Sequence, residues 1–373
     1  MAHTLVESDA GLAALVEGGQ TADAVMVDTE FMRRDTFFPQ AALVQLCFSN
    51  APEQAWLVDP LAVSDMTPLK NLFANPAIVK VLHSPSEDLE VFQCFLGVQP
   101  LPLFDTQRAA AFAGLGFGIG YRPLVEKITG EVLDKGETRS DWLRRPLTES
   151  QQAYAAADVL PLLAVYRHLR ERLDALDRSD WVFEDSARAV REASEPAAPA
   201  YLRIKSAWKL SPQQLAVLAA VCDWREQRAR QLDKPRSWIL PDKVCFALAQ
   251  RTPANAAELR GVPDMPQAVA RKQGEALLDL ISDAGRHTDH DLPEPPGRPL
   301  DAEQRARLKA VKQKAAELAR AWQVEPEALL SSKDYELMVR LQGHAGDDMP
   351  DRWSGWRREA LIEPLLAVAR GQH

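Results

Sequence analysis

The sequence has few cysteines and no long hydrophobic run. Its four cysteines, among 373 residues, lie far apart and form no C-x-x-C pair, which argues against a zinc site or a disulfide framework and is typical of a reducing cytoplasm. No apolar run approaches the roughly 20 residues that a membrane-spanning helix needs. The first ten residues carry His3, Glu7 and Asp9 without a basic segment, so no secretory signal is expected. We therefore predict a cytoplasmic protein that does not enter a membrane.

Net positive charge is also lacking, since the formal net charge is −9. The acidic excess lies in residues 1–185, whereas residues 186–373 are close to balance. An acidic surface repels phosphate unless cations neutralise it, so this asymmetry is compatible with a carboxylate metal site or with a merely solubilising surface. The absence of a G-x-x-x-x-G-K-S/T phosphate loop leaves a role as a helicase accessory module without support.

Strand and helix signals alternate in the first half of the chain. Five strands are predicted, at residues 24–31, 41–48, 55–58, 78–82 and 101–104. Short connections predict that the first three form an antiparallel meander. A helix over 66–73 would then allow a parallel crossover to the fourth, which gives a mixed five-stranded sheet flanked by helices.

Two Pro-rich segments, 193–200 and 284–300, are predicted to be linkers. Between and after them, the spacing of apolar residues predicts helices without strands. The sequence therefore predicts an α/β domain at 1–192 and two small all-α domains at 201–284 and 300–373.

Two acidic residues stand two positions apart in the first predicted strand, VMVDTEF (25–31). Side chains alternate between the two faces of a strand, so Asp28 and Glu30 point the same way. Two like charges in apolar surroundings are unfavourable unless a cation binds them or a pKa shifts. A D-x-E pattern is also common on exposed strands, so this pair is weak evidence by itself.

The segment LHSPSEDL (82–89) indicates the end of a strand and the start of a helix. We predict Ser84 as the N-cap, Pro85 at the first helical position and Glu87 as the partner in a capping box. Asp88 then lies in the first helical turn. Taken alone, its carboxylate could simply stabilise the helix dipole.

A third segment, QAYAAADV (152–159), is predicted to be helical. Tyr154 and Asp158 are four positions apart, so they share one face of the helix. The small alanines between them would let this helix approach the sheet closely. The alternative is an exposed acidic residue beside a half-buried tyrosine.

Together, and in this order, the three segments resemble the three exonuclease motifs of the DEDD superfamily, whose fold is similar to ribonuclease H. Across nearly its whole length the chain further resembles bacterial ribonuclease D. The strings that carry this resemblance are DTEFMRRDTFFPQAALVQL (28–46), HSPSEDLEVF (83–92), LFDTQRAAAF (103–112), LDKGETRSDWLRRPLTESQQAYAAADV (133–159) and WREQRARQLDKPRSWILPD (224–242). The last string resembles an HRDC domain, a small helical nucleic-acid-binding module. A more degenerate HRDC-like domain would cover the region after residue 300.

The resemblance implies a 3′→5′ exoribonuclease that releases nucleoside 5′-monophosphates with two divalent ions, Mg²⁺ or Mn²⁺. In that reading Asp28, Glu30, Asp88 and Asp158 hold the ions, and Tyr154 orients the attacking water. A tyrosine rather than a histidine in the third motif is typical of the tyrosine subclass of the superfamily. The resemblance also implies a monomer that matures tRNA precursors and other small structured RNAs.

Four further residues are candidate substrate contacts, each with a structural alternative. Phe31 could stack near a terminal base or pack in the core, and His83 could touch substrate or support a strand end. Lys135 and Arg139 could meet phosphate or lie on a solvated loop. Asp105 is predicted to be a structural or turn-capping residue.

Basic residues gather in two helical stretches of the second half. Residues 224–238 hold five basic and two acidic residues, and residues 302–320 hold six and two. Such faces can follow a phosphate backbone, although a solvated helix face has the same composition. Two alternatives to the exoribonuclease remain, namely a DNA 3′→5′ exonuclease of the same superfamily and an inactive nucleic-acid-binding scaffold.

Overall fold

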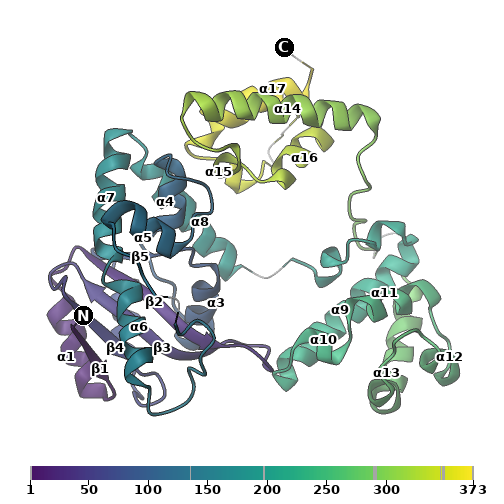
Figure 1. Ribbon diagram of the computed structural model, residues 1–373. Helices are drawn as coiled ribbons and strands as arrows, with labels where there is room; N and C mark the ends of the chain where they lie inside the picture. The colour runs from purple at the N-terminus through teal and green to yellow at the C-terminus, as the bar shows by residue number, and fades with distance from the viewer. Residues whose placement is uncertain are drawn as a thin grey trace. The chain divides into compact units, whose positions relative to one another are not determined.

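The computed structural model describes residues 2–134, 136–195, 198–288, 292–344, 346 and 349–371 (Figure 1). Contacts divide the chain into two compact units. The first comprises Met1–Met32, Gln40–Ser194 and Leu300–His373, and the second comprises Arg33–Pro39 and Glu195–Pro299. The two units are described in turn.

A mixed six-stranded sheet forms the centre of the first unit, in the order β1-β4-β3-β2-β5-β6. The strands are β1 (Ala2–Val6), β2 (Ala24–Met32), β3 (Gln40–Phe48), β4 (Gln54–Val58), β5 (Val79–Leu82) and β6 (Leu103–Asp105). The predicted antiparallel meander is confirmed for β2, β3 and β4, and β5 joins β2 in parallel as expected. The predicted number of five strands is wrong because β1 was missed. In this edge strand only Val6 is fully buried, so it has little hydrophobic pattern to detect.

Helices cover both faces of this sheet, and the alternation of β2 shows which helices lie on which face. Val25 and Val27 belong to a core with residues of α1 (Asp9–Gly19), α2 (Thr67–Ala74) and α3 (Ser86–Phe95). Ala24 and Met26 belong to a second core on the opposite face. Most of the helical residues of that second core come from α4 (Thr106–Phe112), α5 (Tyr121–Thr129), α6 (Glu149–Val159) and α7 (Leu162–Ala175), and α8 (Ser179–Ser194) and α15 (Pro326–Leu329) add Val182 and Ala328. Each face of β2 is thus assigned to a different helical layer.

The C-terminal helical segment, residues 300–371, packs within the first unit. Its helices are α14 (Ala302–Ala321), α15 (Pro326–Leu329), α16 (Ser332–Arg340), a π-helical turn (Arg358–Ile362) and α17 (Glu363–Ala369). They enclose a core of their own. Trp356 also stacks on Trp181 of α8 (Ser179–Ser194), with ring centroids 3.9 Å apart and planes 4° from parallel. Aromatic contact therefore fastens this segment to the α/β part.

The second unit is helical, as predicted. Its α-helices are α9 (Pro212–Leu232), α10 (Arg236–Ile239), α11 (Asp242–Arg251), α12 (Ala256–Arg260) and α13 (Gln267–Gly285). The segment Arg33–Pro39 belongs to this unit because Asp233 accepts hydrogen bonds from the backbone N–H groups of Phe37 and Phe38. Among the described residues, no helix is long and apolar enough to cross a membrane.

Candidate active site

Strand β2 brings two carboxylates to the same face of the sheet. Side chains alternate along β2, so Asp28 and Glu30 lie on the same face of the strand as Ala24 and Met26. They therefore point toward the layer that contains α6. A β-bulge follows at once, because the register with β3 shifts between Glu30 and Phe31. Bulges re-aim side chains and are frequent beside active sites.

Helix α6 supplies the third carboxylate. It begins with a capping box in which Thr148 and Gln151 exchange hydrogen bonds, and it places Tyr154 and Asp158 one turn apart. One carboxylate oxygen each of Asp28, Glu30 and Asp158 can be chosen so that all three lie within 4.8 Å of one another. This group has the composition and spacing of a site for a hard divalent cation, which prefers oxygen ligands.

Asp88 reaches the site from the opposite layer. It lies in the first turn of α3, as predicted, and its Oδ1 accepts a 2.5 Å hydrogen bond from the hydroxyl of Thr29. Thr29 stands between Asp28 and Glu30 and therefore points to the other face of β2. Asp88 is outside the 4.8 Å group, yet its charge still raises the pKa values of Asp28 and Glu30.

The predicted cap of α3 is wrong. The helix begins at Ser86, and no side-chain cap bond is made at its N-terminus. The backbone N–H of Ser84 instead donates to Asp105 Oδ1 at 3.0 Å, and Ser84 adopts a left-handed φ of 57°. Asp105 also caps α4 by accepting from the backbone N–H groups of Gln107 and Arg108, which confirms its predicted structural role.

The carboxylates repel one another in the metal-free protein. Burial, followed by the charges of the neighbouring carboxylates, raises the pKa of Asp28 well above its usual range and that of Glu30 to about 9. Burial also raises the pKa of Asp158 to about 7 and that of Asp88 to about 6. Such shifts mean that ionisation of these carboxyl groups costs free energy in the folded chain. A bound cation would lower that cost.

Arg122, in the first turn of α5, is a site residue that the sequence did not reveal. Its Nη2 donates to the hydroxyl of Tyr154 at 3.1 Å, and its guanidinium lies 5.6 Å from the centre of the tyrosine ring. Its charge also lowers the pKa of Asp158. No local pattern marks Arg122, because α5 and α6 are brought together only by folding.

The four residues predicted as candidate substrate contacts have different surroundings. Phe31 is half-buried at the bulge and Arg139 is exposed. His83 Nδ1 lies 3.0 Å from the hydroxyl of Thr106, and burial lowers the pKa of His83 to about 4, so the ring is neutral and structurally engaged. Lys135 lies outside the described residues.

Several basic residues of the stretch 224–238 are already paired within the protein and are less available to bind phosphate than the composition indicates. Arg225 is 2% exposed and donates to the carbonyl of Leu240 and to Asp242. Arg230 and Arg236 both pair with Glu226. These cations stabilise the helical unit, so Arg225 fits neither the phosphate-binding face nor the solvated helix face that the composition left open.

Comparisons with known proteins agree with this geometry. A 3′-5′ exonuclease family model matches residues 4–174, and an HRDC domain model matches residues 214–281. The ribonuclease D of Pseudomonas paraeruginosa is 41% identical, and the match covers 97% of this chain and 96% of the relative. The chain belongs to the ribonuclease D family. The ribonuclease D of Escherichia coli strain K12 is 34% identical, with 98% of each chain covered.

Solved structures give the same result. The crystal structure of Escherichia coli RNase D, described as an exoribonuclease involved in structured RNA processing, matches with a TM-score of 0.92 and 33% identity over 100% of this chain and 99% of that chain. The catalytic core of RRP6 from Trypanosoma brucei matches with a TM-score of 0.59 and 26% identity over 76% of this chain and 79% of that chain. This member of the ribonuclease D family is a 3′→5′ exoribonuclease that acts on RNA and depends on divalent metal. The ribonuclease H-like exonuclease fold and the helical HRDC region predicted from the sequence are confirmed.

Proposed function

We propose that Asp28, Glu30, Asp88 and Asp158 hold two divalent ions, Mg²⁺ or Mn²⁺, at which RNA is hydrolysed from its 3′ end. The observation that carries this proposal is the group of three carboxylates whose oxygens lie within 4.8 Å of one another, and the charge of Asp88 raises the pKa values of two of them. The raised pKa values of all four fit the same proposal, because burial makes ionisation of these carboxyl groups costly and a bound cation would lower that cost.

Divalent ions bound here would lower the pKa of the attacking water and offset the charge that develops on the phosphate oxygens. The protein supplies the positions. The rigid strand β2 fixes Asp28 and Glu30, and the capped helix α6 fixes Asp158. The Thr29 hydroxyl donates a hydrogen bond to Oδ1 of Asp88 and fixes that oxygen.

Tyr154 orients the attacking water by a hydrogen bond. Burial raises the pKa of its hydroxyl above the usual value, so at neutral pH it keeps its proton and is a poor general base. Arg122 donates to the same hydroxyl and thereby limits its rotation. Arg122 therefore acts as a positioning residue for Tyr154.

The substrate class is proposed to be tRNA precursors and other small structured RNAs, processed by a monomer in the cytoplasm. The products would be nucleoside 5′-monophosphates. Phe31 would stack on the terminal base, and Lys135 and Arg139 would meet phosphate. The four carboxylates would serve DNA equally well, so DNA remains the alternative polymer for the site itself.

A digest of 3′-labelled and 5′-labelled RNA, with Mg²⁺, Mn²⁺ or EDTA, tests the proposal. We expect early release of a labelled mononucleotide from the 3′-labelled strand, stepwise shortening of the 5′-labelled strand, and no reaction in EDTA. Full activity in EDTA would show that hydrolysis does not need the proposed divalent ions. Faster digestion of a matched single-stranded DNA would favour the alternative polymer.

A further inference from the structure

A fully buried glutamine lies in an interior strand of the sheet, beside the candidate active site. Gln45 of β3 is 0% exposed, and among the described residues neither its Nε2 nor its Oε1 has a hydrogen-bond partner. Every other described side chain with a buried, unpartnered nitrogen or oxygen has only one such atom. The packing of the fold alone therefore gives no reason for an amide at this position.

The register of the sheet places Gln45 directly opposite Asp28. Strands β2 and β3 are antiparallel, and these two residues form one of their pairs. Residues that are directly opposite each other point to the same face of a sheet, with Cβ atoms about 4.5–5.5 Å apart. The amide of Gln45 therefore lies on the face that carries the carboxylates of Asp28 and Glu30. Because a glutamine side chain is long, its rotation can bring Nε2 to the Asp28 carboxylate.

The other neighbours of Gln45 on this face offer the amide little. Across the sheet on the far side from Asp28 it pairs with Leu57 of β4, and along β3 it is flanked by Leu43 and Cys47. Helix α6, which covers this face, shares an apolar core with Leu43 and Leu57. Two leucines and a weakly polar thiol cannot satisfy an amide, so Asp28 is the cross-strand neighbour that can.

Burial of an amide is unfavourable unless something binds to it. An unpaired buried donor or acceptor loses its hydrogen bonds to water and gains none from the protein. A methionine or a leucine would fill a similar volume without this loss. A buried polar group of this kind therefore has a reason other than stability, such as a role in the site that it adjoins.

An ionised carboxylate at Asp28 would match the donor that Gln45 carries. A carboxylate only accepts hydrogen bonds, whereas the Nε2 of an amide only donates them. Carboxylates that bind metals usually accept a hydrogen bond from a further group, which sets their orientation. Asp88 already has such a donor in the hydroxyl of Thr29. Gln45 is placed to serve Asp28 in the same way.

We propose that Gln45 is a positioning residue for Asp28, to whose carboxylate its Nε2 donates a hydrogen bond when a divalent ion is bound. The bond limits the rotation of that carboxylate. The inference rests on the metal site proposed above, because the partner of the amide is a metal-bound carboxylate. Gln45 thus lowers the stability of the metal-free protein and raises its affinity for metal.

Substitutions in the full-length protein test this role. Gln45→Met removes the amide and keeps an unbranched side chain of similar length, and Gln45→Leu is a second apolar replacement in case methionine packs poorly. Leu57→Met is the matched control, because it changes the packing beside Gln45 on the side away from Asp28 and leaves the amide in place. For each protein, electron paramagnetic resonance follows Mn²⁺ binding without RNA, and a thermal scan follows unfolding in EDTA.

For the two Gln45 variants, metal affinity and stability are expected to change in opposite directions. Mn²⁺ should bind roughly tenfold to a hundredfold more weakly, which is the usual effect of losing a hydrogen bond to a metal ligand. The metal-free protein should unfold at a temperature roughly 2–4 °C higher, because apolar atoms replace an unpaired buried amide. Leu57→Met should bind Mn²⁺ normally and should not unfold at a higher temperature.

Equal Mn²⁺ affinity of the unchanged protein and both Gln45 variants would overturn the inference. So would a lower unfolding temperature of both variants in EDTA, since the amide would then have partners in the metal-free protein. If Leu57→Met weakens Mn²⁺ binding as much as Gln45→Met does, packing and not the amide sets the affinity, and the role of Gln45 is excluded. Failure of the unchanged protein to bind Mn²⁺ would instead overturn the metal site itself, and the inference with it.

Discussion

A hydrogen bond between Thr29 and Asp88 joins strand β2 to helix α3 at the candidate active site. The hydroxyl of Thr29, on one face of β2, donates to Oδ1 of Asp88 at 2.5 Å, while Asp28 and Glu30 on the other face meet Asp158. One strand therefore holds carboxylates from both layers. Thr29, which stands between two of the proposed metal ligands, thus holds the side chain of a third.

Removal of this hydroxyl should weaken the site without unfolding it. Thr29→Val keeps the shape of the side chain but leaves Asp88 without its partner, so its carboxylate is free to turn. We expect turnover to fall roughly tenfold and to recover in part at high Mn²⁺, since outer partners of metal ligands typically contribute tenfold to a hundredfold. Thr29→Ser should keep near-normal activity. Equal activity of the valine and serine variants in a steady-state assay would contradict this role.

Asp158→Asn should have opposite effects on catalysis and stability. The change removes a proposed metal ligand, so turnover on RNA should fall below a tenth of normal even with saturating metal. It also removes one charge from a group of like charges, so the metal-free protein should unfold at a higher temperature. A thermal scan in EDTA, together with a digest in Mg²⁺, measures both effects. Retained turnover would remove Asp158 from the site, and a lower unfolding temperature would contradict the repulsion.

The stability of the metal-free protein should fall as pH rises. Glu30, Asp158 and Asp88 have folded-state pKa values of about 9, 7 and 6, all above the usual values for these carboxyl groups. These three groups therefore bind more protons in the folded chain than in the unfolded chain from about pH 4 to about pH 9, and the stability that they contribute is lost across that window.

Unfolding temperatures measured from pH 5 to pH 9 in EDTA test this dependence, with Mg²⁺ or Mn²⁺ as the comparison. Metal should reduce the loss because it favours the ionised carboxylates. The Asp158→Asn variant serves as the control, and its curve in EDTA should be flatter than that of the unchanged protein. If unfolding temperature depends on pH in the same way in the two proteins, Asp158 does not contribute to the pH dependence.

Tyr154→Phe should lower kcat more than it changes the affinity for RNA. The ring and its packing remain, whereas the hydroxyl that would orient the water is lost, so we expect a fall in kcat of roughly tenfold or more. Arg122→Met should give a smaller fall, because Tyr154 keeps its hydroxyl but loses the donor that holds it. Pre-steady-state turnover with a short RNA separates kcat from binding. An unchanged kcat for Tyr154→Phe would exclude the hydroxyl from the reaction.

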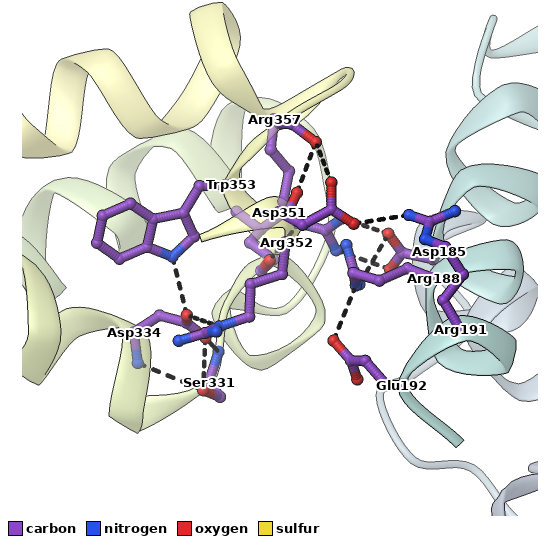
Figure 2. A network of polar contacts seen from close by, with 12 residues as sticks. Asp185, Arg188, Arg191, Glu192, Ser331, Asp334, Asp351, Arg352, Trp353 and Arg357 are labelled. Carbon is purple, nitrogen blue, oxygen red and sulfur yellow. Dashed lines mark hydrogen bonds and ion pairs between the residues drawn. The ribbon is translucent and has the colours of Figure 1, made fainter. Parts of the chain in front are cut away.

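The buried ion pair of Arg357 with Asp185, shown in Figure 2, should be costly to break on one side. Arg357→Met leaves the carboxylate buried with only Arg188 beside it, and we expect a loss of roughly 3 kcal/mol in the free energy of unfolding. Asp185→Asn in the same chain should recover part of this loss, because a buried carboxylate that Arg188 compensates only in part is replaced by a neutral amide. Denaturant unfolding of the single and double variants gives the comparison. An additive loss in the double variant would show that the two residues are not coupled.

This docking also affects how the C-terminal region can be studied. Deletion of residues 201–373 would raise the KM for RNA if the helical modules hold the substrate. The same deletion would expose the face of Trp181 on which Trp356 stacks and leave Asp185 without Arg357. Point substitutions of exposed basic residues therefore separate RNA binding from stability better than truncation does.

The sequence by itself determined the parts of the site that depend on local geometry. Strand alternation placed Asp28 and Glu30 on one face, and helical periodicity paired Tyr154 with Asp158. These relations extend over two to four residues, so the chain carries them in any context that keeps the strand and the helix. The family resemblance followed from the same short motifs.

Only the tertiary structure decided which of these parts meet and what supports them. Thr29 is 59 positions from Asp88, Arg122 is 32 from Tyr154, and Asp185 is 172 from Arg357. Their contacts depend on how the helical layers pack on the sheet and how the C-terminal segment docks. Packing is set by the sum of many apolar contacts across the core, and no single local pattern encodes it.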